Sequence, residues 1–63
     1  MNIIIFGLGK IYRKYIDGIK KQDKIIAYTD NNKELQGKYI NGNKIISPED
    51  IYKLPYDKIV IMS

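Results

Sequence analysis

The amino-acid sequence predicts an α/β fold, specifically half of a doubly wound fold: a four-stranded, mostly parallel sheet with one helix on each face. Short β-branched runs alternate along the chain with segments of helical periodicity, which is typical of parallel strands joined by crossover helices. The length of 63 residues accommodates one small domain. A chain of this size buries only about 60% of the surface that its unfolded form exposes. We therefore expect residues 1–63 to form a single half-domain and to be a fragment of a longer protein.

The first half of the chain predicts a β-α-β unit. Residues 1–6 contain a continuous run of β-branched and aromatic side chains, which is typical of a strand buried on both faces of a parallel sheet, and residues 24–29 predict a second strand. Between them, helical periodicity predicts a helix over residues 10–21. The apolar side of this helix carries Ile11, Tyr12, Tyr15, Ile16 and Ile19. We expect its tyrosines to lie in the core and its charged side to lie in solvent.

The third predicted strand covers residues 44–46. The preceding residues 30–43 are rich in Asn, Gly and charged side chains, so we expect mostly loop there. Within this segment, Asn41-Gly42 is a strong turn signal that would join residues 38–40 to the third strand as a hairpin.

A second helix and a fourth strand are predicted to complete the sheet. Ser47 is an expected N-cap, Pro48 suits the first helical position, and Asp50 has the spacing of a capping box. The Leu54-Pro55 pair ends this helix, and residues 57–62 are another apolar run. Right-handed crossovers and the strand order 3-2-1-4 would place the two helices on opposite faces of the sheet.

Composition excludes several classes of site. The chain has no Cys and no His, which excludes disulfides, the usual zinc sites and Cys or His catalysis, and we expect no metal. No constellation of nucleophile, acid and base is visible, so we expect no catalytic residue in this segment. No apolar run has the length of a transmembrane helix and no secretory signal is present, so we expect a cytoplasmic chain without a membrane segment.

The net charge of +4 is concentrated in one segment. Between Lys10 and Lys24 the chain has six basic residues and two acidic ones, and the remaining charges balance. The single Arg speaks against nucleic acid, because Arg is the residue that recognises guanine through two hydrogen bonds. We expect no nucleic-acid partner, although binding of a phosphate surface by the basic helix stays an alternative.

A glycine-rich turn joins the first predicted strand to the first helix. Gly7 and Gly9 occupy the first two glycine positions of a dinucleotide-binding turn, where the chain turns tightly and a phosphate approaches the backbone. The candidate phosphate contacts are Gly7, Leu8, Gly9, Lys10 and Ile11, because the N–H groups of a helix N-terminus bind anions. Tyr12 stands at the third glycine position and is expected to push the helix outward. The alternative is a purely structural turn.

Three more candidates lie where other strands end. Asp30 and Asn31 follow the second strand, where a carboxylate can accept hydrogen bonds from a ribose. Ser63 ends the fourth strand at the same edge of the sheet. The alternative for Asp30 is a polar turn in which its carboxylate binds only local backbone N–H groups.

The order of these motifs resembles a known family. The glycine turn with Gly7 and Gly9, the acid Asp30 and the Ser-Pro-Glu sequence at residues 47–49 resemble the Rossmann-like N-terminal domains of bacterial sugar-nucleotide and surface-polysaccharide enzymes, such as dehydratases, epimerases and sugar acyltransferases. Tyr12 departs from this pattern, because many relatives have Gly there. The resemblance implies NAD(P) or a nucleotide sugar as ligand and implies that the catalytic residues lie outside this segment.

Together these observations predict a nucleotide-binding module, with a small nucleotide ligand as its partner. The alternative is a structural module that associates through uncovered sheet surface, either with a second copy as a homo-oligomer or with the remainder of its own domain.

Overall fold

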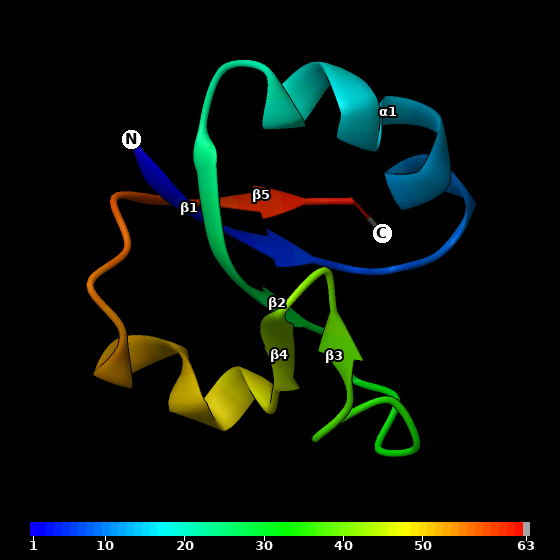
Figure 1. Cartoon of the computed structure of the whole chain (residues 1–63). Coiled ribbons are helices and arrows are strands. Elements are labelled where there is room, and N and C mark those ends of the chain that lie inside the picture. The colour runs from blue at the N-terminus through cyan, green and yellow to red at the C-terminus, as the bar shows by residue number, and fades with distance from the viewer. Residues whose placement is uncertain (63) are drawn as a thin grey trace.

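The computed structural model describes residues 1–62, except for the side chain of Lys20. In chain order the elements are β1 (Asn2–Phe6), α1 (Lys10–Lys20), β2 (Lys24–Thr29), β3 (Tyr39–Ile40), β4 (Asn43–Ile46), the 3₁₀ helix η1 (Pro48–Lys53) and β5 (Lys58–Ile61). Figure 1 shows α1 on one side of the sheet and η1, drawn in yellow and orange, on the other side.

The sheet has five strands in the order β3-β4-β2-β1-β5. The central strand β1 runs parallel to both of its neighbours, β2 and β5, and β4 runs parallel to β2. Ile3, Ile4 and Ile5 of β1 are completely buried, because both faces of the sheet are covered there.

The predicted four-stranded sheet of order 3-2-1-4 is wrong, because an additional strand, β3, makes the sheet five-stranded and mixed. β3 pairs antiparallel with β4 at the edge, which confirms the hairpin predicted from Asn41-Gly42 within a segment otherwise expected to be loop. The turn between them explains the extra strand: Asn41 (φ 49°) and Gly42 (φ 85°) both have left-handed backbone conformations. Two such residues in succession make the turn that matches the twist of a two-stranded hairpin.

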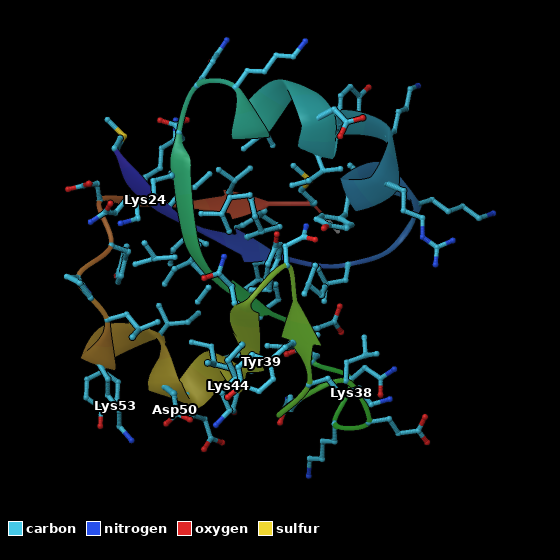
Figure 2. All side chains as sticks on the ribbon, viewed as in Figure 1. Lys24, Lys38, Tyr39, Lys44, Asp50 and Lys53 are labelled. Carbon is cyan, nitrogen blue, oxygen red and sulfur yellow. The ribbon has the colours of Figure 1, made fainter. Side chains whose placement is uncertain are left out.

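The prediction of one helix on each face is also wrong, because the second helix is only a six-residue 3₁₀ helix, η1. Ser47 caps it as expected, its Oγ accepting from the N–H of Glu49 at 3.4 Å. Asp50 makes no capping box and instead binds Lys53, with 3.0 Å between Oδ1 and Nζ; Figure 2 shows both side chains on η1. None of the η1 side chains is fully buried and Pro55 follows closely, so neither packing nor length favours an α-helix.

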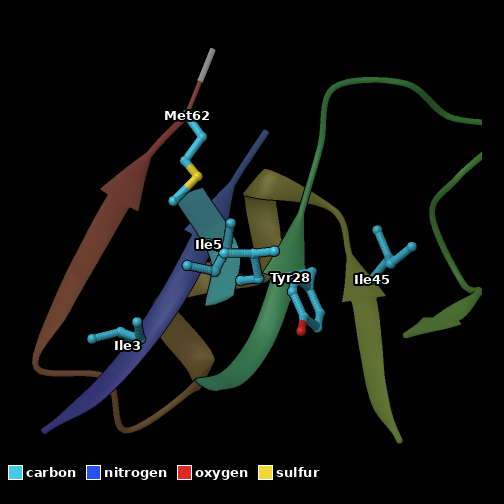
Figure 3. Close-up of a cluster of buried hydrophobic side chains, with 6 residues drawn as sticks. Ile3, Ile5, Tyr28, Ile45 and Met62 are labelled. Carbon is cyan, nitrogen blue, oxygen red and sulfur yellow. The ribbon is translucent and has the colours of Figure 1, made fainter. Parts of the chain in front are cut away.

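The main core lies between α1 and the sheet. It joins Ile16 of α1 to Ile3, Ile5, Tyr28, Ile45 and Met62, most of which are labelled in Figure 3. Tyr12 packs against this cluster, with its ring edge-to-face with Tyr28 and the ring centroids 5.8 Å apart. Tyr15 is 54% exposed, so the expectation that the helix tyrosines lie in the core is wrong for that residue.

Candidate functional site: the glycine turn above β1

The candidate site lies where β1, β2 and β5 reach the same edge of the sheet. An open cavity of about 410 Å³ is found there, and its lining comes from the β1–α1 turn and the residues that follow β2 and β5. The lining residues are Gly7, Leu8, Gly9, Lys10, Ile11, Asp30 and Met62. In open parallel sheets, ligands bind outside the carboxyl ends of the strands, which is the place of this cavity.

Gly7 and Gly9 have different roles in the turn. Gly7 has a φ of 103°, a conformation that side chains strongly disfavour, and its N–H donates to the carbonyl of Thr29 at 2.9 Å. Gly9 is exposed and has a negative φ of −86°, and no neighbouring atom lies within 4 Å of the place where a Cβ would be. Gly7 therefore serves the fold of the turn, while Gly9 leaves its outer side open.

Asp30 connects the end of β2 to this turn. One carboxylate oxygen accepts from the N–H of Leu8 at 3.0 Å, and the other accepts from the N–H of Asn32 at 2.8 Å. The carbonyl of Asp30 accepts in addition from Nε2 of Gln36 at 2.9 Å. Asp30 therefore binds local backbone, as the alternative interpretation predicts, but it also holds the turn from 22 residues away.

The N-terminus of α1 opens toward the same edge. Its first intrahelical bond runs from the N–H of Arg13 to the carbonyl of Gly9 at 3.2 Å, so the N–H groups of Lys10, Ile11 and Tyr12 precede the helical ladder. Gly9 supplies no side-chain cap, and the first turn contains no acidic residue. Lys10 is exposed beside these groups. The helix dipole, the free N–H groups and Lys10 together favour an anion.

Tyr12 does not occupy the mouth of the turn. Its ring lies under α1 against Tyr28, so the side chain at the third glycine position is accommodated in the core. Burial, followed by the adjacent phenol of Tyr28, raises the pKa of Tyr12 from 10.0 to about 12.

The cavity brings together six of the eight residues that the sequence suggests for a ligand: Gly7, Leu8, Gly9, Lys10, Ile11 and Asp30. Asn31 is exposed and does not contribute to the lining, and Ser63 lies outside the described residues. The sequence analysis missed Met62, although its place directly after an apolar run that ends at this edge is the signal that could have identified it.

Two further observations on residues 1–62 concern metal binding and membrane-spanning helices. Within this range no three carboxylates gather closely enough to hold a metal ion. The described helices also include none that is long and apolar enough to cross a membrane.

Comparison with known protein families identifies the family of this chain. A family model described as C2185-like, N-terminal, matches residues 1–63. The chain belongs to this C2185-like N-terminal family. The expected membership of the sugar-nucleotide and surface-polysaccharide enzyme families is therefore wrong, because the short motifs around Gly7, Asp30 and residues 47–49 occur here in a different family. No curated protein matches the C2185-like chain.

Proposed function

We propose that this C2185-like domain binds the phosphate of a nucleotide at the N-terminus of α1, with NAD(P) or a nucleotide sugar as the ligand. The observation that carries the proposal is the open side of Gly9, which adjoins an uncapped helix N-terminus and lines the cavity. Nothing within the described residues blocks a Cβ at this position, so the space beside Gly9 is available to a ligand.

Charge and size agree with a phosphate-containing ligand of moderate size. Lys10 adds a positive charge to the helix dipole, and a volume of about 410 Å³ lies in the range of ligand pockets. Leu8, Ile11 and Met62 give the lining apolar side chains on which a flat ring can pack. A ligand of this kind is abundant in the cytoplasm, the compartment that the proposal requires.

Asp30 has a positioning role in this proposal. Its contact with the N–H of Leu8 holds the turn, and each carboxylate oxygen retains a lone pair for a ribose hydroxyl. The proposed activity is binding without catalysis; among the described residues that line the cavity there is no nucleophile with an adjacent base.

Titration followed by amide chemical shifts tests the proposal. Inorganic phosphate, NAD(H), NADP(H) and UDP-glucose are added separately to the 63-residue chain, and we expect saturable shifts centred on Gly9 and Lys10. Gly9→Val should abolish the response by filling the open side, and Lys10→Ala should weaken ligand affinity about twofold to fivefold, the usual effect of an exposed charge near a helix terminus.

Lys33→Ala is the matched control, because Lys33 is exposed and lies outside the cavity lining. It should bind as the unmodified chain does. Absence of shifts at millimolar ligand, or shifts that Gly9→Val leaves unchanged in a folded protein, would refute the proposal.

A further inference from the structure

A second cavity, larger than the glycine-turn cavity, lies between α1 and the edge strand β5. This α1–β5 groove has a volume of about 510 Å³. Its lining is Ile11, Tyr15, Gly18, Ile19, Gln22, Asp23, Lys58, Val60, Ile61 and Met62. It shares Ile11 and Met62 with the glycine-turn cavity but continues along α1 to the opposite end of the helix.

Three large apolar side chains of the groove lining are exposed. Ile11 is 46% exposed, Tyr15 is 54% exposed and Ile61 is 70% exposed. Within the described sheet, β5 pairs only with β1, so its outer edge adjoins the same apolar surface. A contiguous apolar surface with polar margins is characteristic of an interaction site.

The margins of the groove are basic. Lys14 on α1 and Lys21 directly after α1 are exposed next to the groove-lining stripe, and Nζ of Lys14 lies 5.4 Å from the centroid of the Tyr15 ring. Lys58 contributes a positive charge from the β5 side. Asp23 is the only acid in the lining, and its Oδ1 lies 4.0 Å from the N-terminal amine of Met1.

We propose that the α1–β5 groove binds an amphipathic helix whose apolar stripe is flanked by acidic residues. Four of the ten lining residues belong to α1 and span the helix from Ile11 to Ile19, which corresponds to about 12 Å. A helix lying beside α1 would use that length, whereas a strand added to β5 would contact mainly the edge. Gly18 has no atom within 4 Å of its Cβ position, so a second helix can approach α1 closely there.

The positive charge at the margins of the groove favours an acidic helix over a second copy of this chain as the partner. In a two-fold dimer the same surface occurs on both sides, so Lys14, Lys21 and Lys58 would face a surface of the same charge. Two copies that each carry a net charge of +4 also repel one another. Acidic side chains flanking an apolar stripe would instead complement the lysines and cover Ile11, Tyr15 and Ile61.

A pair of designed peptides tests the groove with the 63-residue chain. Both peptides are acetylated and amidated helices with the same leucine stripe; one has Glu on both sides of the stripe and the other has Lys. Fluorescence anisotropy should show saturable binding of the Glu peptide, at least about tenfold tighter than binding of the Lys peptide. Tyr15→Asp should weaken binding of the Glu peptide by a similar factor, because it places a negative charge in the apolar lining of the groove.

A variant with reversed charges at the margins of the groove tests the origin of the peptide preference. The double variant Lys14→Glu/Lys58→Glu should lose affinity for the Glu peptide and gain affinity for the Lys peptide. Lys33→Glu/Lys44→Glu changes the net charge equally at exposed positions outside the groove, and the peptide preference should stay unchanged. Both double variants alter exposed side chains only, and circular dichroism establishes that they fold.

Three outcomes would overturn the inference. They are equal affinity for the two peptides, an unchanged preference in Lys14→Glu/Lys58→Glu, and a dimer in sedimentation that Ile61→Asp dissociates, since a dimer would make a second copy the occupant. Gly9→Val leaves the groove intact, so failure of nucleotide binding and failure of helix binding are distinguishable.

Discussion

The carboxylate of Asp30 accepts a hydrogen bond from the backbone N–H of Leu8 at 3.0 Å, which joins the end of β2 to the turn between β1 and α1. The same carboxylate accepts from the N–H of Asn32, so a single side chain orders two turns. Because the turn contains Gly7 and Gly9, which are permissive residues, this bond restrains a segment that would otherwise be free to adopt other conformations.

Asp30→Ala should destabilise the chain by about 1–3 kcal/mol, since the N–H of Leu8 loses its acceptor in a partly buried place. It should also weaken nucleotide binding, because the turn is no longer held. Urea denaturation measures the first effect and amide-shift titration the second. Glu34→Ala, an exposed acid four residues further on, should change neither. Unchanged stability of Asp30→Ala would show that the Leu8 bond contributes nothing to the fold.

The two glycines of the turn should separate stability from binding. Gly7→Ala places a side chain at a φ of 103° and should cost about 1–3 kcal/mol of unfolding free energy. Gly9→Ala should stay within about 0.5 kcal/mol of the original stability, because its Cβ meets no neighbour. Denaturation curves of the two variants test this directly. A larger loss for Gly9→Ala than for Gly7→Ala would contradict the assignment of roles.

Tyr12→Phe should change the stability of the chain in alkali. The pKa of Tyr12 is 10.0 in the unfolded reference and about 12 in the folded chain, so its contribution is complete below pH 10. Above that pH the unfolded chain releases this proton while the folded chain retains it, and stability falls between pH 10 and about 12.

Phe at position 12 removes that proton, so the variant should lose less stability over the same pH range. Urea midpoints of both proteins at several alkaline pH values provide the measurement, and the difference between them cancels the titration of the lysines. Parallel curves would show that Tyr12 has the same pKa in both states.

Thr29→Val should loosen the edge of the sheet. Thr29 is completely buried and its Oγ1 donates to the carbonyl of Ile46 at 2.8 Å, which links β2 to the end of β4. Val has nearly the same shape but leaves that carbonyl without this donor, at a cost of about 1–2 kcal/mol. Hydrogen exchange should accelerate at the N–H of Ile45 more than in β1. Uniform acceleration across the sheet would argue against a local effect.

The positions of helices and strands were predicted most closely where the sequence carries a single structural signal. The apolar runs of β1 and β2 have no competing helical periodicity, and α1 has a clear apolar stripe, so their positions could be predicted closely. The region around η1 carried helix start signals, but none of its six residues is fully buried. Local capping signals indicate where a helix begins, whereas packing decides how far it continues.

The sequence predicted which residues lie at the site, but not which of them are in contact. The glycine spacing and the position of Asp30 placed both at one edge of the sheet, but the bond between Asp30 and Leu8 depends on the orientation of a side chain across 22 residues. The position of Tyr12 against the core agrees with the prediction for the apolar side of the helix, but its contact with Tyr28 could not be predicted. Its place in the motif suggested a clash with the turn, while the position of Tyr28 on β2 gave its ring a partner beneath the helix.

The placement of β1 at the centre of the sheet has a consequence for the order of folding. β1 and its neighbour β5 are far apart in the sequence, with Ile4 beside Ile59. Contacts between such distant segments form slowly, because the intervening chain must first be ordered. The three buried isoleucines of β1 therefore lack one neighbouring strand until β5 has been synthesised, and the incomplete sheet exposes a very apolar strand to chaperones or to aggregation.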